Sequence, residues 1–134
     1  MNKIIYKKAF SLIELIFVIA VLAIISSIAI PKLMNLNSKA NISVIKQDIN
    51  TIISSVQSYY LANEKIDKIS DAINLNSKIW NITDKEVKYI ENSKDCIKIT
   101  LTTNDITLNI DSSAGNICNK LANEGISNTI YNFN

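Results

Sequence analysis

The first pattern along the chain is a run of apolar residues close to its beginning. From Phe10 to Ile30, Glu14 is the one charged residue. At about 1.5 Å per residue, a helix over this run is roughly 31 Å long, which matches the hydrocarbon core of a bilayer. The pattern predicts a membrane-spanning helix.

A different pattern follows Pro31, where apolar residues recur every three or four positions. They are Ile42, Ile45, Ile49, Ile52, Val56 and Tyr59 or Tyr60. This spacing predicts an amphipathic helix with one buried face. Joined to the apolar run, it predicts one helix from about Phe10 to Asn63, on the order of 80 Å long.

The remaining residues, 64–134, predict a small domain. Between Glu64 and Lys94 the pattern is weak, with a short helix indicated around Ile66, Ile69 and Ile73 and a short strand in KEVKYIE, residues 85–91. From about 97 to 110, apolar and polar residues alternate on both sides of Asn104-Asp105, which predicts an antiparallel hairpin. The tail, residues 119–134, fits either an edge segment or a mobile end. The fold class is therefore α+β, with a long helix packed on a small antiparallel sheet.

Composition excludes several functions. The 134 residues include 14 lysines and 12 acidic residues, without histidine or arginine, so no basic field for nucleic acid is present. Residues 34–134 contain no catalytic triad, metal-ligand spacing or glycine-rich loop, so no enzyme is predicted. Cofactors are not expected, and Asp105, Asp111 and Glu124 are too scattered to indicate a structural calcium site.

The charges at the amino terminus predict the orientation in the membrane. Lys3, Lys7 and Lys8 precede the apolar run without an acid, which keeps residues 1–9 in the cytoplasm and places the rest outside. If that side is oxidising, Cys96 and Cys118 can form a disulfide that encloses the hairpin. Such a bond contributes roughly 3 kcal/mol in the chain-entropy model.

Two general interpretations of the apolar run leave features unexplained. A secretory signal peptide has a shorter apolar core and a small-residue cleavage site, which is not found before Pro31. A plain single-pass anchor fits the length and the lysines but not Glu14, because an isolated acid within the membrane costs at least about 2.5 kcal/mol.

The stretch KKAFSLIEL, residues 7–15, together with the apolar run resembles the class III leader and mature start of type IV pilins and pseudopilins. The resemblance implies that a prepilin peptidase cuts between Ala9 and Phe10 and that Phe10 is then N-methylated. Lys7 and Lys8 match the basic leader. Ala9 departs from the family, which most often has glycine before the cut.

The same resemblance implies roles for other residues. Glu14 becomes the fifth residue of the mature chain, where it receives the amino-terminal ammonium of a neighbouring subunit and sets the register of assembly. Pro31 stands where many members carry a proline that breaks the helix in the filament. A carboxyl-terminal disulfide loop, here Cys96 to Cys118, is common among type IV pilins. Removal of residues 1–9 leaves 11 lysines against 12 acids, which gives no support for direct DNA binding.

The function implied is that of a structural subunit, a pseudopilin or minor pilin, in a filament for type II secretion, DNA uptake or a surface pilus. The expected parts are a leader at 1–9, a membrane and filament-core helix at 10–30, an amphipathic helix at 31–63 and a head at 64–134. The expected location is the inner membrane with the head in the periplasm, and then the filament. Expected partners are other pilin subunits, the prepilin peptidase and the inner-membrane assembly platform. The alternative is a membrane-anchored extracytoplasmic binding module, which predicts that residues 1–9 are retained.

Overall fold

The computed structural model describes residues 9–133, without the side chains of residues 31, 33–38 and 40. The chain divides into two compact units, Met1–Asn37 and Ser38–Asn134. Helix α1, Leu12–Asn63, contains residues of both units, and its bounds confirm the predicted helix to within two residues at its start. Pro31 lies inside α1, and the helix break proposed for the filament stays a prediction.

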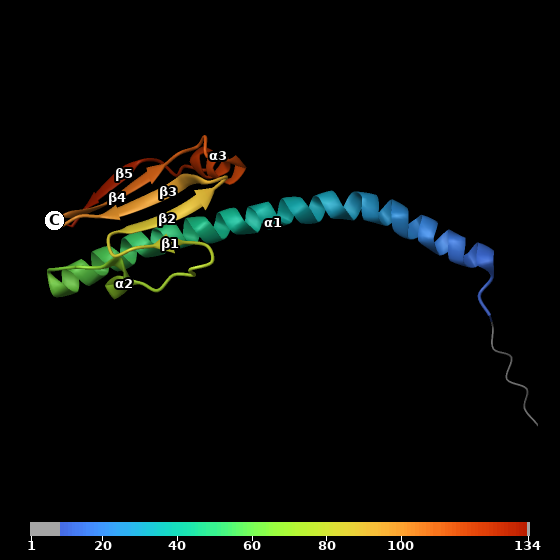
Figure 1. Ribbon diagram of the computed structural model, residues 1–134, viewed down its shortest axis with the longest axis horizontal. Helices are drawn as coiled ribbons and strands as arrows, with labels where there is room; N and C mark the ends of the chain where they lie inside the picture. The colour runs from blue at the N-terminus through green and yellow to red at the C-terminus, as the bar shows by residue number, and fades with distance from the viewer. Residues whose placement is uncertain (1–8, 134) are drawn as a thin grey trace, which may run out of the picture. The chain divides into compact units, whose positions relative to one another are not determined.

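The second unit is built on a five-stranded sheet in the order β1-β2-β3-β4-β5, and every neighbouring pair is antiparallel (Figure 1). The strands are β1, Asn81–Ile82; β2, Glu86–Glu91; β3, Lys94–Leu101; β4, Asp105–Ile110; and β5, Thr129–Asn132. Two short helices complete the unit: α2, Ile69–Ala72, and α3, Asn116–Asn123. The α+β fold predicted from the sequence is confirmed.

The predicted hairpin is formed by β3 and β4, whose register pairs Ile99 with Leu108 and Leu101 with Ile106. Because side chains alternate along a strand, these four residues share the inner face of the sheet, and all four are buried. The strand expected in KEVKYIE is β2, and the short helix expected near Ile69 is α2.

The core lies between the inner face of the sheet and the part of α1 from Ile42 to Val56, and Figure 1 shows the sheet running along this part of the helix. The predicted stripe is buried: Ile42, Ile45, Ile49, Ile52 and Val56 are all at most 3% exposed. Trp80 is buried at the edge of this core, where its indole Nε1–H donates a hydrogen bond of 2.7 Å to Asp48. Fully burying side chains of this size contributes about 1.5–3 kcal/mol each.

The sequence interpretation did not predict α3 or the two-residue strand β1, and it left the tail open between an edge segment and a mobile end. Cys118 lies in the first turn of α3. The tail, which the pattern left open, forms edge strand β5 and ends on Phe133, whose ring stacks on Tyr60 at 4.5 Å between centroids. Helix α3 and strand β5 are both held by contacts with residues that are distant in the sequence.

Candidate functional site

The segment before α1 is an exposed stretch without regular structure. Ala9, Phe10 and Ser11 precede the first helical residue, Leu12, and Phe10 is 81% exposed. The carbonyl of Ser11 accepts hydrogen bonds from the amides of Glu14 at 3.1 Å and Leu15 at 3.2 Å. An exposed, irregular peptide is the form in which a protease can bind a chain, so the Ala9–Phe10 bond is accessible.

Glu14 lies in the first turn of α1, three residues after Ser11. Its amide donates a hydrogen bond of 3.3 Å to the Ser11 hydroxyl, which therefore caps the helix. The spacing Ser-x-x-Glu is that of a capping box, and a carboxylate in the first turn also interacts favourably with the helix dipole. The observed cap is therefore the Ser11 hydroxyl, and the Glu14 carboxylate adds its charge to the first turn of α1.

The apolar run forms a helical segment with no cover of its own. Leu12–Ile30 is long and apolar enough to span a membrane, and none of this segment is buried. Its large hydrophobic side chains, from Leu12 to Ile30, are between 39% and 77% exposed. The Ser27 hydroxyl donates a hydrogen bond of 2.7 Å to the carbonyl of Ile24 in the same helix. Such a surface requires lipid or other apolar helices around it.

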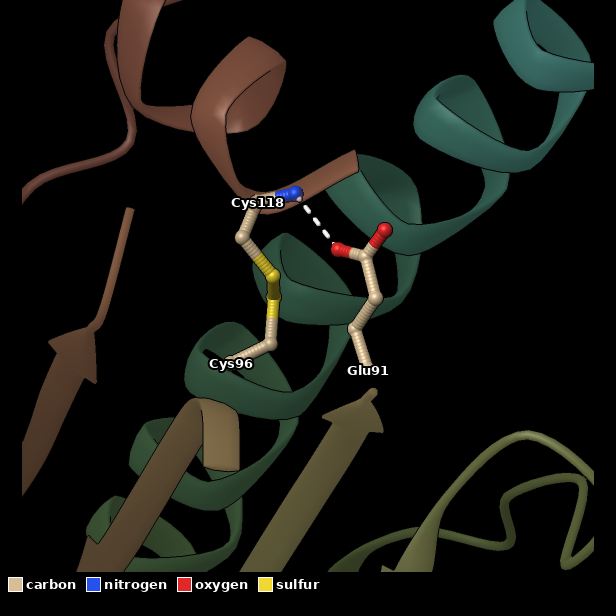
Figure 2. A group of neighbouring side chains, drawn as sticks. All are labelled: Glu91, Cys96 and Cys118. Carbon is tan, nitrogen blue, oxygen red and sulfur yellow. Dashed lines mark hydrogen bonds between the residues drawn. A yellow bond between two sulfur atoms is a disulfide. The ribbon is translucent and has the colours of Figure 1, made fainter. Parts of the chain in front are cut away.

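In the second unit, the structure brings Cys96 and Cys118 together as a disulfide. Cys96 comes from β3 and Cys118 from the first turn of α3, with their Cα atoms 5.7 Å apart. Both residues are buried. Figure 2 shows the bond beside the carboxylate of Glu91. The bond links α3 to the sheet, in agreement with the pairing predicted for an oxidising compartment.

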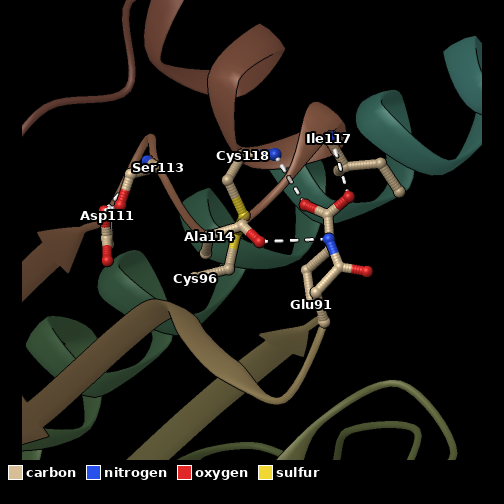
Figure 3. The surroundings of a disulfide bond; sticks show 8 residues. Glu91, Cys96, Asp111, Ser113, Ala114, Ile117 and Cys118 are labelled. Atoms are coloured by element: carbon tan, nitrogen blue, oxygen red, sulfur yellow. Dashed lines mark hydrogen bonds between the residues drawn. A yellow bond between two sulfur atoms is a disulfide. The ribbon is translucent and has the colours of Figure 1, made fainter.

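Glu91, which the sequence interpretation did not single out, caps α3 from the end of β2. The amide of Ile117 donates to one carboxylate oxygen and the amide of Cys118 to the other, both at 3.0 Å (Figure 3). The next residue, Asn92, donates from its side chain to the Ala114 carbonyl at 3.1 Å. The turn between β2 and β3 therefore binds the start of α3 through three hydrogen bonds.

The segment before α3 is shaped to admit the Glu91 carboxylate. Gly115 is the N-cap residue and offers no side-chain hydrogen bond of its own. A Cβ atom at this position would collide with the Glu91 side chain. Upstream, Asp111 accepts hydrogen bonds from the Ser113 hydroxyl at 2.6 Å and amide at 2.9 Å, which lower the pKa of the Asp111 carboxyl. This small turn directs the chain toward Gly115.

The grouping of Glu91, Cys96 and Cys118 has the composition of a metal site, and their ligand atoms lie within 4.8 Å of one another. The two sulfurs are bonded to each other, and both carboxylate oxygens accept hydrogen bonds from α3. Burial raises the pKa of the neighbouring Tyr89, and the negative charge of Glu91 adds to this effect. The group is therefore organised as a covalent and electrostatic clamp on α3.

The predicted site residues fall into separate regions. Ala9, Phe10 and Glu14 lie together at the start of α1, and Cys96 and Cys118 meet in the second unit. Lys7 and Lys8 lie outside the described residues, and Pro31 belongs to α1. The roles assigned to Lys7, Lys8, Phe10, Glu14 and Pro31 stay predictions.

One comparison with known proteins bears on the amino-terminal region. The family description "prokaryotic N-terminal methylation motif" matches residues 5–30. These residues therefore carry the class III prepilin leader of type IV pilins and pseudopilins. A search of curated proteins and a search of solved structures return no match to this chain.

The motif and the structure together define a coarse class. The motif supports a pilin-like or pseudopilin-like subunit that is processed at its amino terminus, and it is typical of structural rather than enzymatic proteins. The apolar helix fits a membrane-anchored pilin, and the long helix with a five-stranded antiparallel sheet is a type IV pilin-like layout.

Proposed function

We propose that this protein is a structural subunit, a pseudopilin or minor pilin, of a type IV pilus-like filament. It is stored in the inner membrane with its head in the periplasm, trimmed by a prepilin peptidase between Ala9 and Phe10, and methylated on Phe10. The observation that carries the proposal is the methylation motif at residues 5–30, which coincides with an exposed cleavage segment and an uncovered apolar helix.

Assembly follows from the physics of the apolar segment. When the subunit leaves the bilayer, the side chains of residues 12–30 need new apolar neighbours, and the same segments of other subunits provide them. The Glu14 carboxylate then meets the ammonium that cleavage creates on a neighbouring subunit. A pair of this kind in a low-dielectric helix bundle disfavours any register that leaves the carboxylate alone.

The proposal is tested by intact mass and amino-terminal sequencing of the protein isolated from its native cell. We expect the loss of residues 1–9 and a methylated Phe10 at the new amino terminus. Ala9→Gly restores the residue most common in the family and should be processed at least as well as the natural chain. An untouched Met1 start, in a cell whose other prepilins are processed, would contradict the proposal in favour of an anchored binding module.

A further inference from the structure

The disulfide of the second unit is closed off from water. Cys96 is 1% exposed and Cys118 is 0% exposed, and both belong to one cluster of buried side chains. A thiol pair becomes a disulfide by exchange with another disulfide, which has to touch a protein sulfur. Neither sulfur is accessible for this contact in the folded unit. The exchange therefore takes place while α3 is away from the sheet, and Cys118 meets Cys96 only as α3 docks.

A bulge in the sheet aims Cys96 into the core. The register of β2 with β3 shifts between Tyr89 and Ile90. Their partners on β3 are Ile97 and Asp95, so Cys96 is left over as an extra residue without a partner on β2. Neighbouring residues of a regular strand point to opposite faces, but Cys96 and Ile97 are both buried. A bulge re-aims a side chain in this way, and here it turns the first sulfur of the bond toward the core.

The end of the same hairpin places Cys118. The Glu91 carboxylate accepts hydrogen bonds from two amides at the start of α3, and one of them is the amide of Cys118 itself. Beside it, the Asn92 side chain donates to the Ala114 carbonyl, and Figure 3 shows these contacts around the bond. A carboxylate oxygen of Glu91 lies within 4.8 Å of both sulfurs. The β2–β3 hairpin therefore carries Cys96 and also the groups that place Cys118.

The turn of this hairpin has a defined shape. Its central residues, Asn92 and Ser93, have positive φ angles of 51° and 62°. Two central residues in this conformation give the tight turn whose twist matches that of the flanking strands. The hairpin joins neighbouring residues, whereas its contacts with α3 join residues 22 to 27 positions apart. Since closing a short loop costs less entropy, the hairpin is expected to be in place when α3 arrives.

We propose that the β2–β3 hairpin is a template that docks the start of α3 and thereby directs the pairing of Cys96 with Cys118. The oxidant is a molecule with a reactive disulfide. One thiol of the chain first exchanges with it, which forms a mixed disulfide and releases one thiol of the oxidant. As α3 docks, the thiolate of the second cysteine attacks the chain's sulfur in the mixed disulfide. The Cys96–Cys118 bond forms, the second thiol of the oxidant leaves, and the two protons lost by the chain end on the reduced oxidant.

This order makes Glu91 a positioning residue for the bond. It acts through the main chain of Cys118, which it holds beside Cys96. Contacts that hold two groups together raise the effective concentration of one beside the other. By linkage, the bond and the docking of α3 stabilise each other by the same factor. Loss of the Glu91 contacts should therefore lower the effective concentration of the thiol pair by about 5- to 150-fold.

Equilibration of the full-length chain in detergent micelles with reduced and oxidised glutathione measures this effective concentration. Glu91→Ala should lower it by the stated factor and slow the closure of the bond. Glu91→Gln has one acceptor oxygen for the two amides of α3, so it should lie between Glu91→Ala and the natural chain. Asn92→Ala removes one hydrogen bond to the Ala114 carbonyl and should cause a smaller loss in the same direction.

A chain without the bond tests the order of events. In the double variant with Cys96→Ser and Cys118→Ser, hydrogen exchange should still show protected amides at positions 117 and 118, because Glu91 holds α3 without covalent help. Addition of Glu91→Ala to this variant should expose both amides to exchange. The amides of β4 should stay protected in both chains, which separates undocking of α3 from unfolding of the unit.

Ile106→Val is the matched control. This residue is 0% exposed and pairs with Leu101, roughly 16 Å along β3 from Cys96. The change weakens the core and should leave the effective concentration of the thiol pair unchanged. An equal loss in this control, an unchanged effective concentration in Glu91→Ala, or unprotected amides at 117 and 118 in the chain without the bond would each overturn the template. None of these measurements involves a filament, so their outcome is independent of the proposed function.

Discussion

The two units of this protein use the same residue type in opposite ways. Isoleucines from Ile13 to Ile30 are exposed along the first unit, whereas Ile42, Ile49 and Ile97 are almost fully buried in the second. Both sets are apolar, but only the second has a sheet to cover it. The difference shows that the second unit contains its own core, while the first needs an environment that the chain itself does not supply.

The largest expected effect comes from changing the first unit alone. Glu14→Ala should leave membrane insertion intact and abolish filament assembly, because it removes the carboxylate that we propose pairs with a neighbouring ammonium. The unfolding free energy of the second unit should change by less than about 0.5 kcal/mol. Sheared filament yield, membrane fractionation and chemical denaturation measure the three quantities.

Glu14→Gln is the matched control, since it keeps the side-chain shape while removing the charge. It should fail to assemble as Glu14→Ala does. Normal filament yield in either variant would contradict an assembly role for the Glu14 carboxylate.

The next effect separates buried from exposed isoleucines on one helix. Ile52→Ala removes a side chain at 0% exposure and should destabilise the second unit by about 2–5 kcal/mol. Ile24→Ala, with a side chain that is 66% exposed, should leave the unfolding of that unit unchanged. Denaturation curves followed by Trp80 fluorescence compare the two variants, and an equal loss of stability would contradict the independence of the units.

Removal of the disulfide tests how much the Cys96–Cys118 bond contributes to the unfolding free energy of the second unit. Replacing both Cys96 and Cys118 by serine should lower the unfolding free energy by roughly 3 kcal/mol, because the unfolded chain regains the freedom of the enclosed loop. Addition of a reductant to the natural protein should have a similar effect. Unchanged stability in the double variant would mean that the bond contributes little beyond the packing of α3.

Loss of the hydrogen bonds between the Glu91 carboxylate and the start of α3 should have a smaller effect. Glu91→Ala leaves the Ile117 and Cys118 amides without their acceptor and should cost about 1–3 kcal/mol. Gly115→Ala should cost a similar amount, since the new methyl group displaces the carboxylate. Because both changes remove one contact, the double variant should be clearly less destabilised than the sum of the single effects, and additivity would refute the shared mechanism.

The smallest effect is expected from the charged network on the outer face of the sheet. The Lys98 hydrogen bond holds the pKa of Glu86 below its ordinary value, and Asp95 raises the pKa of Lys88. The Glu86 contribution is therefore complete above pH 4.5 and lost as the pH falls through the lowered pKa. The Lys88 contribution is complete below pH 10.5 and lost above the raised pKa.

Thermal unfolding from pH 3 to pH 7 measures how the Glu86 contribution to stability is lost in acid. The melting temperature should fall slightly more steeply with acid in the natural protein than in Glu86→Gln, because the variant has no carboxylate to protonate. Exposure keeps this difference small, since all four members of the network are accessible to water. Identical slopes would show that the network has no measurable effect.

Some of the missed structure was visible in the sequence in principle. Gly125 adopts a positive φ of 99° after α3, and the amide of Ile126 donates to the Leu121 carbonyl, as at the end of many helices. A glycine in this place, after apolar residues at 117, 118 and 121, is a signal for the end of a helix. The sequence interpretation did not use this signal. Strand β5 had no comparable pattern, because its isolated apolar residues lie among serine and asparagine.

The sequence by itself determined the features that depend on neighbouring residues. The leader motif, the uncovered apolar helix, the stripe on α1 and the β3–β4 hairpin all follow from short spacings, because helix and strand geometry convert those spacings directly into faces. Only the tertiary structure decided which distant residues meet. It placed Glu91 against the start of α3, joined Cys96 to Cys118, and made the tail an edge strand beside β4. These contacts depend on the packing of the whole unit, which no local pattern encodes.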